Sequence, residues 1–106
     1  MNEVYEPLSM NPLREYREHE YDILDIAWSS SPDKPYMLLT CSMDCKVILW
    51  DLNKEHHLQI FEHPDVPTKV CFNPDLDNLF ISVCLDKSIR LWDINQKKKP
   101  IDHQQT

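Results

Sequence analysis

Side chains of the types used in hydrolytic catalysis occur in two sets along this chain. The sets comprise His19, Thr40 and Asp44, and then His63, Ser82 and Asp86. A hydroxyl, an imidazole and a carboxylate form a catalytic triad when the imidazole accepts the hydroxyl proton. Such a site is expected once, beside oxyanion donors, and no donor loop is visible in this sequence. The recurrence therefore favours a structural hydrogen-bond network, with a hydrolytic site as the weaker alternative.

A second kind of chemistry, zinc binding, is suggested by Cys41, Cys45, His56 and His57. The Cys-x₃-Cys spacing is tolerated at zinc sites. However, Cys41 is expected in a strand and Cys45 in the following turn, where the two side chains need not converge. Free cysteine is usually buried, so packing is favoured over metal binding, and we expect no metal and no cofactor. The cysteines expected to stay reduced are Cys41, Cys45, Cys71 and Cys84.

The polar sets recur because the chain contains an internal repeat. His19 and His63 are 44 residues apart, whereas Trp50 and Trp92 are 42 apart. The two extra residues fall in the polar stretch Ser29–Pro35, which contains two prolines and is typical of a loop. A period of about 40–45 residues is typical of four-stranded propeller repeats. The sequence therefore predicts an all-β fold with about two blades of an incomplete propeller.

Short β-rich runs supply the strands of these blades, and no helical periodicity is sustained. The predicted strands are Ile23–Trp28, Met37–Cys41, Val47–Asp51, Leu58–Phe61, Thr68–Phe72, Leu79–Val83 and Ile89–Asp93, with a lone outer strand at Leu13–Arg17. Tight turns are expected at Asp44-Cys45 and Asp86-Lys87, because aspartate side chains bond nearby backbone amides. The side chains expected in core and edge packing are Met43, Leu85, Phe61, Phe72 and Phe80.

Four regions follow from these strands. Residues 1–12 are an N-terminal tail, and 13–61 hold the outer strand and the first blade. Residues 62–94 form a second blade that lacks its outer strand, and 95–106 are a polar, Lys-rich tail. Propellers close with about four to eight blades. Three alternatives remain open: a piece of a larger propeller, an inactive remnant, or self-assembly in which Leu13–Arg17 pairs with Ile89–Asp93 of another copy.

The order histidine, hydroxyl residue, aspartate and Trp-Asp resembles the signature of the WD-repeat β-propeller family. The resemblance implies that histidine bonds aspartate, the hydroxyl bonds histidine, and the indole bonds the hydroxyl. The implied structural tetrads are His19, Thr40, Asp44 and Trp50, and His63, Ser82, Asp86 and Trp92. The family implies a non-catalytic scaffold for protein–protein interaction.

Several segments are similar to the Rab-binding WD-repeat proteins of recycling endosomes and their fungal relatives. These segments are Ile23–Ser29, Leu38–Asp44, Phe72–Asp75 and Phe80–Ser82. The resemblance implies a role in vesicle trafficking with a small GTPase as a partner. No segment of this chain matches the Rab-binding region of that family.

The chain departs from the family where glycine is usual. Glu18 and Glu62 precede the two histidines, and Cys45 and Lys87 follow the turn aspartates. The chain contains no glycine at all. Residues with a Cβ must therefore adopt positive φ at turns, which costs strain.

Composition excludes several classes of function. The net charge of −7 argues against binding to nucleic acid or adsorption to an anionic membrane. No secretory signal and no run of about 20 apolar residues is present, so we expect a soluble cytoplasmic protein that reaches endosomal membranes only through partners. The basic run Lys97–Lys99 is interpreted as a solvated end.

Charged residues surround the expected entries to the innermost strands. We call them the charged rim: Glu20, Asp22, Asp25, Asp65 and Lys69. The family resemblance implies that such a rim binds protein partners. A merely solvated acidic face is the alternative.

Overall fold

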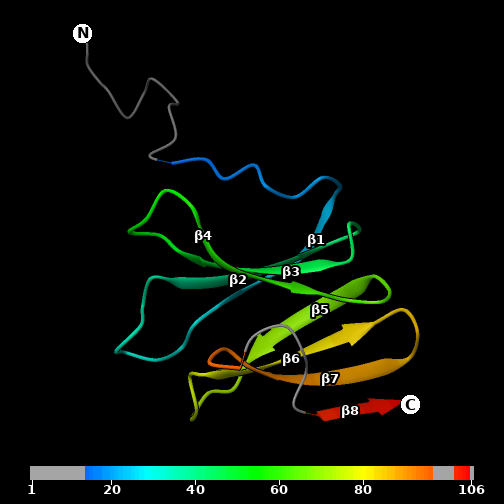
Figure 1. The fold of residues 1–106 in the computed structure, drawn as a ribbon. Coiled ribbons are helices and arrows are strands. Elements are labelled where there is room, and N and C mark those ends of the chain that lie inside the picture. Colours follow the sequence, from blue (N-terminus) through cyan, green and yellow to red (C-terminus); the bar gives the residue numbers. More distant parts are fainter. Residues whose placement is uncertain (1–13, 97–101, 106) are drawn as a thin grey trace, which may run out of the picture.

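The computed structural model describes residues 14–96 and 102–105, and this part of the chain contains strands and no helix. The strands are β1 (Ile23–Trp28), β2 (Met37–Ser42), β3 (Lys46–Asp51), β4 (His57–Glu62), β5 (Pro67–Phe72), β6 (Leu79–Cys84), β7 (Ser88–Asp93) and β8 (Asp102–Gln105). They form two antiparallel four-stranded sheets, ordered β1-β2-β3-β4 and β5-β6-β7-β8 (Figure 1). The predicted all-β fold with two propeller-type blades is confirmed. No helix in the described residues is long and apolar enough to span a membrane.

Tight turns join the second and third strands of each blade. Lys46 N donates to Asp44 Oδ1, and Ser88 N donates to Asp86 Oδ1, at 3.1 Å each. The residue after each aspartate has a left-handed backbone, with φ of 68° at Cys45 and 69° at Lys87. The strain expected from the missing glycines is therefore located at these two positions.

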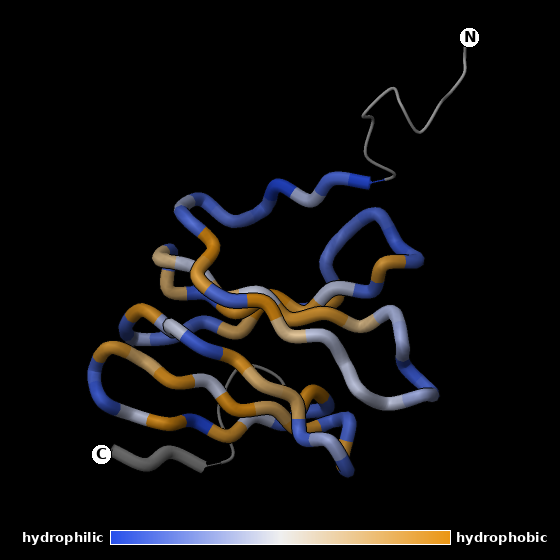
Figure 2. Tube along the Cα trace, turned by 180° about the vertical axis from the view of Figure 1, so that it is seen from behind, coloured by the Kyte–Doolittle hydropathy of each residue, from blue (hydrophilic) through white to orange (hydrophobic). Residues whose placement is uncertain are grey.

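Alternation along the strands places one apolar row of each blade between the two sheets. Leu39 pairs with Leu49 and Cys41 with Val47, so these four side chains share one face of the first sheet. Facing them from the second sheet are Val70, Phe72, Phe80 and Trp92. Strand β5 packs against β1 and β2, so the two sheets share one core (Figure 1). Hydrophobic colour follows these strands and polar colour the connecting loops (Figure 2).

The second blade has a fourth strand, so the prediction that it lacks one is wrong. β8 pairs with β7 from Ser88 opposite Gln105 to Leu91 opposite Asp102. The outer edge of β7 presents backbone N–H and C=O groups that can pair with a further strand of any sequence. A polar segment can therefore serve as the fourth strand. Residues 102–105 are thus part of the blade and not of a tail, and in the single chain β8 occupies the edge at Ile89–Asp93 that strand exchange would use.

The prediction of a lone outer strand at Leu13–Arg17 is wrong for Arg14–Arg17, the part that the structure describes. Leu13, with residues 1–12, lies outside the described residues, and Arg14–Arg17 does not form a strand. A strand needs a neighbour for its backbone groups, and no strand of the described chain lies beside this segment to pair with it. Tyr16 instead packs on Trp50 with ring centroids 4.6 Å apart, and its hydroxyl donates to Lys54 O (2.7 Å).

Candidate functional site

The first blade joins all four residues of its tetrad. Trp50 Nε1 donates to Thr40 Oγ1 (2.9 Å), Thr40 Oγ1 donates to His19 Nε2 (2.6 Å), and His19 Nδ1 donates to Asp44 Oδ2 (3.0 Å). This order satisfies every donor with one acceptor when the imidazole is neutral and protonated on Nδ1. The chain of bonds ties β3, β2, the segment before β1 and the β2–β3 turn together.

Asp44 has backbone donors in addition to the imidazole. Glu20 N donates to Asp44 Oδ2 (3.0 Å) and Lys46 N to Asp44 Oδ1. Burial by itself raises the pKa of Asp44, but the hydrogen bonds from Glu20 N–H and from His19 outweigh it and hold the pKa below its ordinary value. The carboxylate therefore stays ionised at neutral pH and fixes the turn.

The second blade makes only part of the same network. Trp92 Nε1 donates to Ser82 Oγ (3.0 Å), and Ser82 Oγ donates to His63 Nε2 (2.8 Å). His63 Nδ1, however, donates to the carbonyl oxygen of Phe61 (3.0 Å). The prediction of a hydrogen bond between His63 and Asp86 is therefore wrong.

Two substitutions between the repeats explain this difference. Pro64 stands where Glu20 stands in the first blade, and proline has no N–H to donate to the aspartate. Arg90 stands where the first blade has Ile48, and its guanidinium bonds Asp86 Oδ2 (3.2 Å). Asp86 also accepts from the hydroxyl of Ser88, which in turn accepts from Arg90. Both substitutions are visible in the sequence, because Pro64 and Arg90 break the match between the two repeats. They could have indicated that Asp86 has different hydrogen-bond partners from Asp44.

The charges of the second blade follow this rearrangement. Hydrogen bonds from Ser88 and Arg90 lower the pKa of Asp86 to about 2. Burial, reinforced by the nearby Arg90 cation, lowers the pKa of His63 from 6.5 to about 4, although the Phe61 carbonyl opposes this shift. His63 is therefore neutral at physiological pH, as the hydrogen bond from Ser82 requires.

The environment of the two hydroxyls suits a structural role. Thr40 and Ser82 are buried, and each hydroxyl accepts an indole N–H from the tryptophan of its blade. A nucleophile needs an open face for its substrate. The described geometry thus supports the structural interpretation of the two sets.

The cysteine and histidine residues considered as zinc ligands do not converge. Cys41 lies in the core between the sheets, where burial raises the pKa of its thiol to about 12, so the thiolate needed for zinc is disfavoured. Cys45 lies in the β2–β3 turn, and His57 Nδ1 lies against the carboxylate of Glu18. Among residues 14–96 and 102–105, no group of three or more possible ligands could hold a metal ion. All four cysteines are free thiols.

The charged rim is divided by the structure. Glu20, Asp22 and Lys69 are exposed, and the Asp65 carboxylate accepts from the neighbouring Val66 N–H (2.7 Å). Asp25 is half-buried, and its Oδ2 accepts from Val70 N (3.1 Å) across the contact between the blades. Asp25 therefore joins the two blades, a role that only the packing reveals, and its place in a partner-binding rim stays a prediction.

Exposed apolar residues lie at the same end of the blades as the rim. Met43 and Leu85, expected in core or edge packing, occupy the turns and are exposed, and Tyr21 is exposed as well. Met43 N donates to Asp22 O (3.0 Å) and Leu85 N to Val66 O (2.9 Å), which fixes each turn beside the entry to its blade. By contrast, Phe61, Phe72 and Phe80 are buried in the core. Sequence alone could not separate Met43 and Leu85 from the three buried phenylalanines, because all five side chains are apolar.

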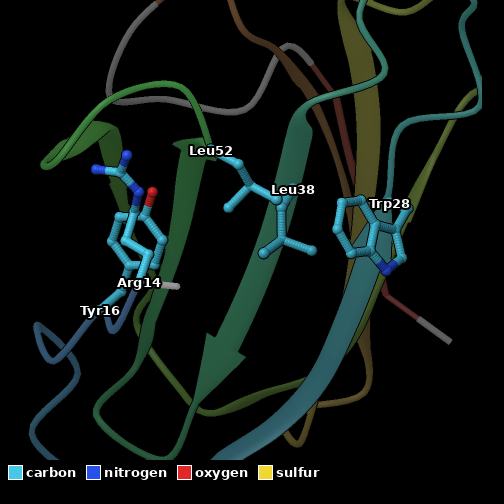
Figure 3. Close-up of a pocket in the computed structure, with 5 residues that line it drawn as sticks. All are labelled: Arg14, Tyr16, Trp28, Leu38 and Leu52. Atoms are coloured by element: carbon cyan, nitrogen blue, oxygen red, sulfur yellow. The ribbon is translucent and has the colours of Figure 1, made fainter. Parts of the chain in front are cut away.

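A pocket opens on the outer face of the first blade. Figure 3 shows its lining, in which Trp28 and Leu38 project from neighbouring strands while Arg14 and Tyr16 come from the segment before β1. Leu52 completes the lining, and the volume is about 550 Å³. The pocket lies on the face opposite the shared core.

Comparison with known proteins accounts for the repeated network. The family model of the WD domain, G-beta repeat, matches residues 10–51 and 55–93, one stretch for each blade. The chain belongs to the WD-repeat family. WD-repeat domains generally act as non-catalytic scaffolds for protein–protein interaction, which fits the structural hydrogen-bond networks of the two blades.

Similar WD-repeat proteins are found in animals and fungi. The chain is 40% identical over 92 residues to WD repeat-containing protein 44 of Xenopus laevis, which covers 87% of this chain and 10% of that protein. It is 39% identical over 84 residues to 2-deoxy-glucose resistant protein 2 of Saccharomyces cerevisiae, covering 78% of this chain and 9% of the relative. An uncharacterized WD repeat-containing protein of Schizosaccharomyces pombe is 35% identical over 83 residues, which is 78% of this chain and 13% of the relative. The chain thus spans about a tenth of the length of these relatives.

Proposed function

We propose that the end of the blades carrying Tyr21 and Met43 binds a protein partner with a basic surface. This end combines exposed apolar side chains with the exposed carboxylates of Glu20 and Asp22. Aromatic and methionine side chains are enriched in the centres of interfaces, and surrounding charges select the partner and steer its approach. The observation that carries the proposal is the fixed position of Met43, whose turn is hydrogen-bonded to Asp22 O.

We further infer that the setting is cytoplasmic membrane trafficking linked to a Rab-type small GTPase. Support comes from the resemblance to the Rab-binding WD-repeat proteins and from the similarity to WD repeat-containing protein 44 of Xenopus laevis. The net charge of −7 opposes direct adsorption to anionic lipids, so recruitment to a membrane would go through a protein partner.

Binding to small GTPases tests this function. Immobilised chain is incubated with a panel of Rab-type GTPases, each loaded with GDP or with a non-hydrolysable GTP analogue. Retention of one GTPase in one nucleotide state supports the trafficking role, whereas no enrichment over empty beads refutes it.

Variants of the rim test the surface itself. Tyr21→Ala with Asp22→Lys should reduce retention at least tenfold and make the remaining binding less sensitive to salt. Asp75→Lys is the matched control, because it reverses an exposed carboxylate in the β5–β6 loop, away from Tyr21. Equal losses in both variants would show that the proposed end is not the binding surface.

A further inference from the structure

The first blade exposes positions that the second blade buries. Ile26 and Trp28 on β1 are 53% and 58% exposed, whereas their counterparts in the repeat, Val70 and Phe72 on β5, are each 6% exposed. The side chains belong to the same face of equivalent strands. The difference arises because the first blade covers the second, while nothing in the described chain covers the first.

The side chains with which the first blade covers the second also have counterparts in the second blade. Met37 and Leu39 on β2 pack in the cluster that contains Phe72 and Phe80. Their counterparts on β6 are Leu79 and Ile81. These lie on the far side of the second blade, where Ile81, Ile89 and Cys71 are exposed.

The molecule therefore carries both halves of an interface that it already forms internally. We call Ile26, Trp28 and Leu38 the front face, and Cys71, Ile81 and Ile89 the back face. We propose that the front face of one copy docks the back face of a second copy, repeating the contact between the two blades. This inference concerns assembly and is independent of the proposed partner at the rim.

The pocket in Figure 3 fits this docking. Three of its lining residues, Trp28, Leu38 and Leu52, correspond in the repeat to Phe72, Phe80 and Ile94, which pack in the shared core with Met37 and Leu39. In the docked pair, Leu79 and Ile81 of the second copy enter the pocket. Exposed apolar area of this kind is a strong driving force for association.

The outer edge of the docked pair involves the segment before β1. Tyr16 packs on Trp50 as Phe61 packs on Trp92, so Arg14–Arg17 occupies the place of an outer strand at the front face. Docking sets this segment beside β7 of the second copy, where β8 lies in the single chain. β8 pairs with β7 over only four residues, and we expect Arg14–Arg17 to replace it there.

Head-to-tail contacts are heterologous, so they build a ring when the rotation between copies closes and an open filament when it does not. Propellers close with about four to eight blades, which corresponds to about two to four copies of this two-blade chain.

The oligomeric mass of the chain and of two face variants tests the proposal. The front variant carries Ile26→Asp and Trp28→Asp, and the back variant carries Ile81→Asp and Ile89→Asp. Wild type should exceed the mass of a monomer in light scattering across a concentration series, and each variant alone should be monomeric. An equimolar mixture should form a dimer with one copy of each, because each variant retains the opposite face intact.

Several results would overturn the inference. A wild type that is monomeric throughout, a back variant that still assembles, or a mixture that stays monomeric contradicts head-to-tail docking. Leu76→Asp is the matched control, since Leu76 is an equally exposed apolar residue in a loop outside both faces and should leave the assembly unchanged.

Disulfide trapping keeps the test independent of how well the aspartate variants fold. In the Ile26→Cys variant, docking brings the new thiol near Cys71 of the second copy, as β1 and β5 adjoin within one chain. Treatment with a thiol oxidant should give linked species on a non-reducing gel, and adding Cys71→Ser should abolish them. Linkage that persists with Cys71→Ser, or no linkage at all, contradicts the arrangement.

Discussion

At the scale of single residues, the Thr40 hydroxyl is the centre of the first network. It accepts from Trp50 and donates to His19, so a residue of the same shape without the hydroxyl leaves two buried groups unpaired. We expect Thr40→Val to lower the free energy of unfolding by about 1–3 kcal/mol. Thr40→Ser keeps the oxygen and should cost clearly less. Urea unfolding followed by tryptophan fluorescence measures both, and equal losses would mean that the hydroxyl contributes nothing.

The left-handed turn residues predict a stabilising substitution. Cys45 has φ of 68°, and its Cβ makes this conformation costly. We expect Cys45→Gly to raise the free energy of unfolding by about 0.5–1 kcal/mol, the steric relief being partly offset by the larger entropy of the unfolded chain. Cys45→Ala retains a Cβ and should give no gain. A gain of similar size in the alanine variant would assign the effect to the thiol and not to the backbone.

The buried His63 predicts a dependence of stability on pH. Its pKa of about 4 in the folded chain lies below its ordinary value of 6.5, so the unfolded chain binds the proton more readily. The stability is therefore complete above pH 6.5 and decreases as the pH falls towards 4, by about 3 kcal/mol at most. Melting temperatures of wild type and His63→Asn across this range test it. The variant should have a flatter profile, and parallel profiles would show that another group causes the loss.

At the scale of elements, the contact between β1 and β5 depends on a polar bond as well as on apolar packing. Asp25 Oδ2 accepts the N–H of the buried Val70, which otherwise lies on an unpaired strand edge. We expect Asp25→Ala to lower the free energy of unfolding by about 1–3 kcal/mol. Asp22→Ala is the matched control, because Asp22 is exposed and contributes its backbone oxygen to Met43. The prediction fails if chemical denaturation gives the same midpoint for Asp25→Ala and Asp22→Ala.

Element boundaries were predictable where local patterns decide them. Strand Ile23–Trp28 has the predicted bounds, and five of the other blade strands differ from the structure by one residue at one end. The predicted strand Leu58–Phe61 is one residue short at each end. β8 was not predictable, because the sequence of Asp102–Gln105 has no apolar alternation to indicate a strand. Arg14–Arg17 shows the converse, since a strand-like sequence remains irregular without a neighbour to pair with.

At the scale of the whole molecule, the two blades share one core and should unfold together. Phe61 of the first blade contacts Phe80 and Trp92 of the second, with ring centroids 4.9 and 5.3 Å apart. We expect Trp92→Ala to cost about 3–5 kcal/mol and to destabilise both blades in a single transition. Far-ultraviolet circular dichroism and the fluorescence of Trp28 and Trp50, both in the first blade, should then report one midpoint. Separate midpoints would mean that the blades fold as independent units.

The sequence by itself determined the repeat, the strands and the positions of the network residues, because periodicity and turn chemistry act over a few neighbouring residues. It did not determine which acceptor His63 would choose, since Phe61 O, Asp86 and Arg90 meet only after the strands have packed. Nor did it separate the buried phenylalanines from the exposed Met43 and Leu85, because hydrophobicity says nothing about which face is covered. Only the tertiary structure decided that Asp25 joins the blades and that Ile26 and Trp28 remain uncovered, since both depend on what packs across the sheet.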